Sequence, residues 1–217
     1  ANEYLKELKD GLYAFKSSHM MLFYPKFILL SAAVNCYLGH LRSSIEILSK
    51  ALEQDLEMFS EEDKVKLQLN LSIYYFMAEE FELSLKTGMS FEKTEKWLEK
   101  NIGKEWVFKK QLMEVIIQVE LGNEDIAINR IRSIERASST MFNHPLYSRA
   151  KSFLDIIKKM LNDPMNFQDE STRDKIESNL VLVPEEREDL QAMTFYAWLK
   201  AKFLNRNFYE VLLETVK

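Results

Sequence analysis

Cys36 and His40 are the two residues of this sequence whose spacing best suits metal chemistry. Ligands four residues apart lie on one face of a helix, as in helical zinc sites. This pair, however, spans Gly39, where we expect a turn, and the other histidines, His19 and His144, are distant in the sequence. We therefore predict no metal site and interpret Cys36 as a small buried thiol.

The motifs that cradle phosphate or activate a nucleophile are missing from the chain. None of G-x-x-x-x-G-K-[ST], G-x-G-x-x-G, G-x-S-x-G or H-E-x-x-H occurs. Acidic clusters at residues 79–82 and 185–189 could in principle supply paired carboxylates for acid–base chemistry. Both clusters fall at predicted helix starts, where they complement the helix dipole and face water. We therefore predict no enzyme activity, no catalytic residue and no cofactor.

The composition indicates an all-α protein. Hydrophobic residues make up 47% of the 217 residues and charged residues 29%, with only 5 glycines and 4 prolines. So few turn formers cannot serve a many-stranded β fold, whereas amphipathic helices with solvated outer faces have this mixture. The single cysteine excludes an internal disulfide, so we expect a cytoplasmic location.

The distribution of charge and hydropathy argues against nucleic-acid and membrane partners. The net charge is −5, and residues 101–160 form a modest basic centre with 10 Lys and Arg against 7 Asp and Glu. Direct nucleic-acid binding requires a much denser positive field. Residues 20–39 are apolar but interrupted by Pro25, Ser31 and Asn35, which suits a buried helix better than a membrane span.

Three of the four arginines of the basic centre lie on one predicted helix. They are Arg130, Arg132 and Arg136. The spacing is compatible with an ordinary solvated helix face, and also with a patch for an acidic partner or a phosphorylated segment.

A segment repeats along the chain at roughly 42 residues. Each copy contains a helix end, a tight turn and a new helix start, at residues 38–45, 77–85, 121–128 and 204–212, and more weakly at 165–167. The residue after each turn is Leu41, Phe81, Glu124, Phe167 or Phe208. Such a period is typical of stacked helical hairpins.

The repeat predicts one helical domain spanning residues 1–217. We expect a first helix at 3–17, followed by repeats at 25–54, 61–99, 105–139, 145–179 and 185–216. The paired helices are 25–38 with 41–54, 61–78 with 81–99 (broken near Gly88), 105–121 with 124–139, 145–161 with 167–179, and 185–204 with 207–216. The helix at 3–17 is either the second helix of an earlier repeat, so that the chain is a fragment of a longer one, or an N-terminal cap.

The turn and the helix after it resemble the tetratricopeptide repeat family. The residues that carry the resemblance are Leu38, Gly39 and Ser44 in one repeat, Ser84 in the next, and Leu121, Gly122 and Ala127 in the third. It covers residues 25–139 and, more loosely, 145–216. The chain lacks the family's tryptophan and closing proline, and its period approaches that of HEAT and armadillo repeats. The resemblance implies an α-α superhelix, a right-handed solenoid of about five helix-turn-helix repeats plus the N-terminal helix.

Such a fold implies a non-catalytic scaffold that binds a peptide or partner helix in a concave groove lined by the first helices. The residues expected there are Lys26, Leu29, Lys66, Leu69, Asn70, Ile73, Phe76, Lys109, Leu112 and Ile116. Each row begins with lysine and continues apolar, which suits an amphipathic partner with acidic residues along one edge. Later helices of the chain can equally fill this face. If the groove is open, Leu69→Asp or Ile73→Asp abolishes partner capture without unfolding.

A second hypothesis is a sensory or regulatory domain. In it, the helical array closes around a peptide signal and controls an attached output domain, such as that of a transcriptional regulator.

Overall fold

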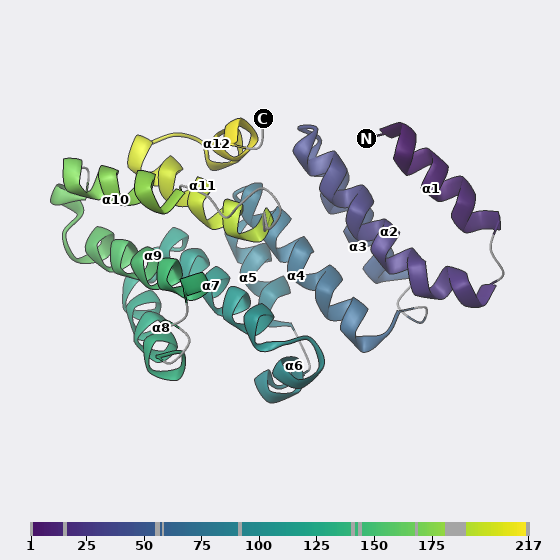
Figure 1. The fold of residues 1–217 in the computed structure, drawn as a ribbon, viewed down its shortest axis with the longest axis horizontal. Coiled ribbons are helices and arrows are strands. Elements are labelled where there is room, and N and C mark those ends of the chain that lie inside the picture. Colours follow the sequence, from purple (N-terminus) through teal and green to yellow (C-terminus); the bar gives the residue numbers. More distant parts are fainter. Residues whose placement is uncertain are drawn as a thin grey trace. The chain divides into compact units, whose positions relative to one another are not determined.

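A computed structural model describes residues 2–14, 17–54, 57, 59–90, 93–139, 142, 145–167, 169–180 and 190–215. These residues form helices and loops with no strand among them, so the all-α prediction is confirmed (Figure 1). The chain divides into two compact units, Ala1–Lys110 (unit 1) and Gln111–Lys217 (unit 2). The single repeat domain expected over 1–217 stays a prediction.

Unit 1 consists of helices that pack against their neighbours in the sequence. They are α1 (Asn2–Ala14), α2 (Ser17–Tyr37), α3 (Leu41–Gln54), α4 (Glu61–Met77), α5 (Phe81–Met89), α6 (Glu95–Asn101) and the first residues of α7 (Lys104–Glu120). The most extensive pairings join α2 with α3 and α4 with α5. The predicted break in the helix at 81–99 is confirmed, because α5 ends at Met89 and α6 begins at Glu95.

Unit 2 contains the rest of α7 and a second set of neighbouring helices. These are α8 (Glu124–Ala137), α9 (Pro145–Asn162), the 3-10 helix η3 (Pro164–Asn166), α10 (Glu170–Leu180), α11 (Leu190–Leu204) and α12 (Phe208–Thr215). Here α11 and α12 form the most extensive pair. The helix start expected at Phe167 is wrong, since that residue caps η3 and α10 begins at Glu170. The predicted start at residue 185 and end at residue 216 lie outside the described residues.

Four turns between helices have the same backbone geometry. The residue at each turn that adopts a positive φ is Gly39 (89°), Glu79 (61°), Gly122 (73°) or Asn205 (51°). Its amide donates to the carbonyl three residues earlier, and the next amide donates to the carbonyl five residues earlier, as in His40 N to Asn35 O (2.9 Å). This pattern satisfies the free carbonyls at a helix end and reverses the chain. The helix starts expected at Leu41, Phe81 and Glu124 are therefore confirmed, and the helix expected from residue 207 begins one residue later, at Phe208.

Small side chains allow α4 and α5 to approach closely. Ser84 Oγ donates to the carbonyl of Ser72 (2.7 Å), and Ser72 Oγ donates to the carbonyl of Ser84 (2.8 Å). A Cβ added to Gly88 would lie 2.9 Å from Ser72 Oγ, closer than real Cβ contacts. In α3, Ser44 Oγ likewise donates to the carbonyl of Ala32 in α2 (2.7 Å). Each of these three buried hydroxyls has a partner, so its burial carries no unsatisfied-group cost.

The start expected at residue 25 for the second helix is wrong, because α2 begins at Ser17 and contains Pro25 in its interior. Proline costs a helix one backbone hydrogen bond. The ring of Pro25 is buried, and the adjacent Tyr24 stacks on Phe59 with ring centroids 6.0 Å apart. This burial offsets the lost hydrogen bond and lets the helix continue through the proline.

The first turn of α4 holds a network of charged side chains. Ser60 caps the helix by accepting a hydrogen bond from the amide of Asp63 (3.1 Å). The carboxylate of Glu61 is 2.7 Å from Lys64 Nζ and 2.9 Å from Lys93 Nζ. Hydrogen bonds from these two lysines lower the pKa of Glu61 from 4.5 to about 2. The network therefore ties α4 to the segment that precedes α6.

We expect Glu61→Gln to make the stability of the fold depend less on pH in the acidic range. Because the folded pKa lies below the unfolded one, the Glu61 carboxylate stabilises the fold above pH 4.5, and this contribution is lost as pH falls toward about 2. The wild-type melting temperature should decline more steeply over this range than that of the variant. Circular dichroism melts at successive pH values measure both slopes. Glu53→Gln, at an exposed position of α3, is the matched control, and parallel wild-type and Glu61→Gln curves would contradict the assignment.

Among the helices whose residues are described, none combines the length and the apolar composition needed to cross a bilayer.

Candidate functional site

Most apolar residues expected in a concave groove are buried. Leu69, Ile73 and Phe76 on α4 are 2%, 6% and 1% exposed, and the ring of Phe76 lies 5.3 Å from that of Phe81 on α5. In unit 2, Leu112 and Ile116 are also buried. Leu29 on α2 is half-buried. These side chains belong to the packed interior, so their role in partner binding stays a prediction.

The polar residues expected at the groove rim lie on three helices. Lys26 on α2 is exposed, with Nζ 5.7 Å from the centroid of the Phe23 ring. On α4, Asn70 Nδ2 donates to the carbonyl of Lys66 (2.9 Å), within the same helix. Lys109 on α7 forms an ion pair with Glu105 one turn earlier (3.1 Å). The structure therefore brings together Lys66 and Asn70 and gives Lys26 and Lys109 local partners.

The structure gives Cys36 a partner other than His40. Cys36 is buried, and its thiol donates to the sulfur of Met77 (3.6 Å), whereas His40 is exposed in the turn after α2. Within the described ranges, no group of three His, Cys, Asp or Glu side chains is placed to hold a metal ion. The side chain of His144 and the acidic cluster at 185–189 lie outside those ranges.

A surface hollow of about 810 Å³ lies along α8 in unit 2. The residues that line it are Asn129, Arg132, Glu135, Arg136 and Ser139. Their spacing places them on one side of α8 and its C-terminal extension, because the opposite face carries the buried residues Ala127, Ile131 and Ile134. Packing of that apolar face therefore holds the lining residues at the surface.

Two arginines dominate the chemistry of the hollow. Arg132 Nη1 donates to Asn129 Oδ1 (3.4 Å), and Arg136 Nε donates to the carbonyl of Arg132 (3.3 Å). Both acceptors are neutral, and both arginines are exposed. In the part of the chain that the structure describes, neither is paired with a carboxylate, in contrast to Arg206, which binds Glu214 through two hydrogen bonds. Two positive charges of the hollow are thus available to a ligand.

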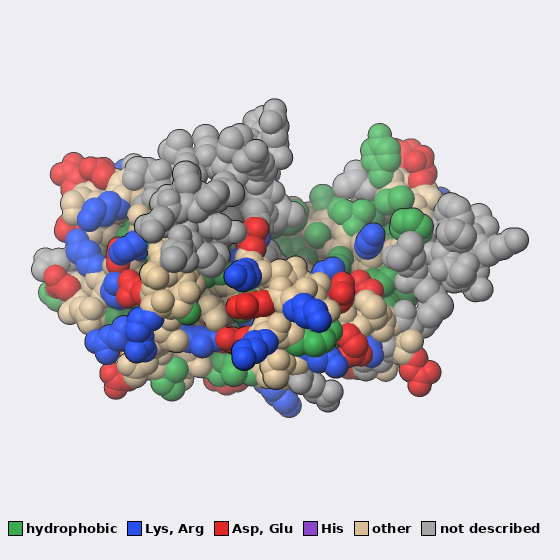
Figure 2. All heavy atoms as spheres, turned by 60° about the horizontal axis from the view of Figure 1, so that its bottom comes forward, with side chains coloured by type: hydrophobic (Ala, Val, Ile, Leu, Met, Phe, Trp, Pro, Cys, Tyr) green, Lys and Arg blue, Asp and Glu red, His purple; other side chains and the backbone are tan. Residues whose placement is uncertain are grey.

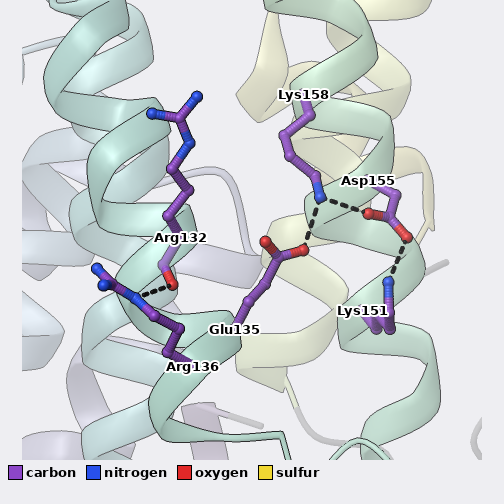
Figure 3. Close-up of polar contacts among 6 residues, drawn as sticks. All are labelled: Arg132, Glu135, Arg136, Lys151, Asp155 and Lys158. Atoms are coloured by element: carbon purple, nitrogen blue, oxygen red, sulfur yellow. Dashed lines mark hydrogen bonds and ion pairs between the residues drawn. The ribbon is translucent and has the colours of Figure 1, made fainter.

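The carboxylates beside these arginines are bound by lysines of α9. Glu135 reaches across from α8, with Oε1 2.6 Å from Lys158 Nζ (Figure 3). Lys158 Nζ is also 2.8 Å from Asp155 Oδ1, and Lys151 Nζ is 2.9 Å from Asp155 Oδ2. In the same view the guanidinium groups of Arg132 and Arg136 lie away from these contacts. The acidic side chains are therefore occupied by α9 and not by the arginines.

The ion pairs of this cluster favour the charged forms of Asp155 and Lys158. Burial acts to raise the pKa of Asp155, but hydrogen bonds from Lys158 and Lys151 outweigh it and hold that pKa below its ordinary value. Burial acts to lower the pKa of Lys158, but hydrogen bonds to Asp155 and Glu135 outweigh it and raise that pKa. The six residues in Figure 3 thus carry four positive and two negative charges. The excess positive charge remains on the arginines.

Lysine and arginine side chains are spread over the molecular surface. Figure 2 shows them interspersed with acidic side chains over the visible face, while a group of hydrophobic side chains is exposed toward the right of the view. The exposed apolar residues of unit 1 include Tyr4 and Leu8 on α1 and Phe23 and Leu30 on α2. The hollow on α8 combines unpaired positive charge with a concave surface.

The sequence indicated the arginines of this site but missed its other members. The basic centre pointed to Arg132 and Arg136, and also to Arg130, whose Nη2 instead lies 2.5 Å from Glu114 Oε2. Asn129, Glu135 and Ser139 carried no separate signal. Their spacing of three or seven residues from the arginines was the available clue, because residues so spaced share a helix face.

Searches against protein-family models, curated proteins and solved structures find no match to this chain.

Proposed function

We propose that this protein is a non-catalytic interaction module that binds an acidic segment of a partner protein along α8. The observation that carries the proposal is the pair Arg132 and Arg136, exposed in a hollow and bound only to neutral acceptors among the described residues. Guanidinium groups bind carboxylates and phosphates through paired N–H donors. They do not lose a proton in proteins, so they offer binding and not acid–base catalysis.

The dimensions and charge of the hollow favour a segment of chain as its ligand. Its lining residues run from Asn129 to Ser139, about three helical turns, so a segment of chain can lie along it. The protein as a whole carries a net charge of −5, so an acidic partner gains attraction only where positive charge is concentrated locally. Such complementarity contributes orientation and specificity as well as affinity.

The proposal places partner contact on α8 because the apolar residues of the expected groove are buried. A partner that contacted Leu69, Ile73 or Phe76 would have to displace the side chains that cover them. The four alike turns support a repeat architecture related to the tetratricopeptide-like solenoids. This relationship and a cytoplasmic location form part of the proposal.

A randomised peptide library tests the proposal even when the partner itself has not been identified. The immobilised wild-type chain should enrich peptides rich in Asp and Glu, and salt should weaken their retention. A variant with Arg132→Glu and Arg136→Glu should bind the selected peptides about tenfold more weakly or worse, because both donors become repulsive. Fluorescence anisotropy with a labelled selected peptide measures the loss.

The matched control reverses two lysines on α6. Lys96 and Lys100 are exposed and four residues apart, and Lys100 occupies the last turn of its helix as Arg136 does in α8. Lys96→Glu with Lys100→Glu therefore makes the same change of charge and should leave peptide binding unchanged. The proposal would be refuted if the wild-type chain did not enrich acidic peptides. It would also be refuted if the variant with Arg132→Glu and Arg136→Glu bound the selected peptides as tightly as the wild type does.

A further inference from the structure

We propose that the hollow on α8 takes a phosphorylated serine or threonine of its partner, with Arg132 and Arg136 as the phosphate-binding pair. This inference rests on the proposed function and specifies the acidic group that the site selects. It depends on the arrangement of charged and neutral donors along one helix face.

Two charged donors, Arg132 and Arg136, line the hollow. Residues four apart on a helix have Cβ atoms about 5–6 Å apart, so two arginine side chains can reach one group by rotating about their side-chain bonds. In Figure 3 the guanidinium groups of Arg132 and Arg136 point in different directions, so a shared ligand would have to draw them together. A carboxylate is satisfied by one guanidinium through two hydrogen bonds. A phosphoryl group has three acceptor oxygens and carries about −1.5 to −2 charge at neutral pH, so it uses both guanidinium groups. The pair Arg132 and Arg136 therefore matches a phosphoryl group better than a carboxylate.

Neutral donors lie in the same hollow as the two arginines. Asn129 Oδ1 accepts from Arg132, which leaves the Asn129 amide NH₂ as a donor toward a ligand. Ser139 is exposed and supplies a hydroxyl at the C-terminal end of the hollow. Neutral donors beside two cations are suited to the several oxygens of a phosphoryl group.

Glu135 is the acidic residue among those that line the hollow. A free carboxylate would repel a dianion, but Glu135 Oε1 is 2.6 Å from Lys158 Nζ. Asp155, which also contacts Lys158, is in turn held by Lys151. The lysines thus neutralise both acids, and each arginine keeps its full charge for the ligand.

The test uses three peptide libraries that differ at one fixed central position between randomised flanks. That position is phosphoserine, glutamate or serine. The wild-type chain should retain the phosphoserine library and bind its selected peptide about tenfold more tightly than the glutamate version of the same peptide. Because the second phosphate pKa is near 6, affinity for the phosphopeptide should fall between about pH 7.5 and 5.5.

A conservative variant separates the geometry of the guanidinium from its charge. Arg132→Lys with Arg136→Lys keeps both charges but loses the paired donors. It should bind the glutamate peptide somewhat more weakly than the wild type does, because one guanidinium pairs with a carboxylate. It should bind the phosphoserine peptide much more weakly, because both guanidinium groups are used there, so most of the preference for phosphoserine is lost. The Lys96→Glu, Lys100→Glu variant again serves as the control and should keep that preference.

The outcomes distinguish this inference from the proposed function. Equal affinity for phosphoserine and glutamate peptides would overturn the inference and leave the acidic-segment proposal standing. Failure of the wild type to retain either library would overturn both. Free phosphoserine or inorganic phosphate that binds as tightly as the selected peptide would show a small phosphorylated ligand and overturn the assignment to a partner protein.

Discussion

Leu69→Asp is expected to unfold unit 1. Leu69 is 2% exposed in the middle of α4, and its neighbours Leu67 and Leu71 are also buried. The substitution removes apolar packing and places a carboxylate where the interior offers no water, at a cost of about 4 kcal/mol or more. Domains of this size are stabilised by about 5–15 kcal/mol in total. Circular dichroism should show lower helicity and a melting temperature far below that of the wild type.

Leu83→Asp provides the control for this experiment. Leu83 lies on α5 in the same unit and is 44% exposed, so the same change of side chain should shift the melting temperature little. A Leu69→Asp protein that melts like the wild type would place Leu69 outside the core and restore the open groove expected from the sequence. A loss of partner capture by the Leu69→Asp variant can therefore be interpreted only together with its melting curve, which shows whether the variant is folded.

Trp198→Ala is expected to destabilise unit 2 by about 3–5 kcal/mol. Trp198 on α11 is 1% exposed, and its ring meets that of Phe153 edge-on at 6.1 Å. Its indole Nε1 donates to Glu120 Oε1 (2.5 Å), and Lys202 Nζ donates to Glu120 Oε2 (2.7 Å). The substitution therefore creates a large cavity and removes a donor from a carboxylate that is only 11% exposed. Urea unfolding followed by circular dichroism measures the loss.

Trp198→Phe separates the two contributions. Phenylalanine keeps much of the buried area but leaves Glu120 Oε1 without the indole donor, so we expect a smaller loss of about 1–3 kcal/mol. Leu204→Ala, at a 45% exposed position of α11, should fall within about 0.5 kcal/mol of the wild type. If the Trp198→Ala protein were no less stable than the Leu204→Ala protein, the assignment of Trp198 to the core would be wrong.

Helix positions were predictable from the sequence because their signals are local. Gly39 and Gly122 marked two turns directly, since glycine readily adopts positive φ. Glu79 and Asn205 were found through the repeat. Asparagine is enriched at left-handed positions but glutamate is not, so the turn at Glu79 had no local signal. The start of α2 was missed because proline is common at helix starts, and burial of Pro25 is a tertiary effect.

The surroundings of the candidate residues were not predictable, because they depend on contacts between helices. Periodicity showed that Leu69 and Ile73 share an apolar face but not whether that face is covered. The arginines of α8 were visible as a basic centre, yet the ion pair between Glu135 and Lys158 joins helices whose relative rotation no local pattern specifies. That ion pair determines which charged side chains remain available to a ligand. The site can therefore be recognised only from the three-dimensional structure.

The tight turns between paired helices also bear on how fast this protein folds. Three of them join helices that pack extensively against each other, namely α2 with α3, α4 with α5 and α11 with α12, so closing these loops costs little entropy. Proteins dominated by such local contacts fold in about microseconds to milliseconds. Ribosomes add roughly 5–20 residues per second, so each hairpin has time to form soon after its second helix emerges. The apolar face of α4 is then covered in part by α5 before the later helices have been synthesised.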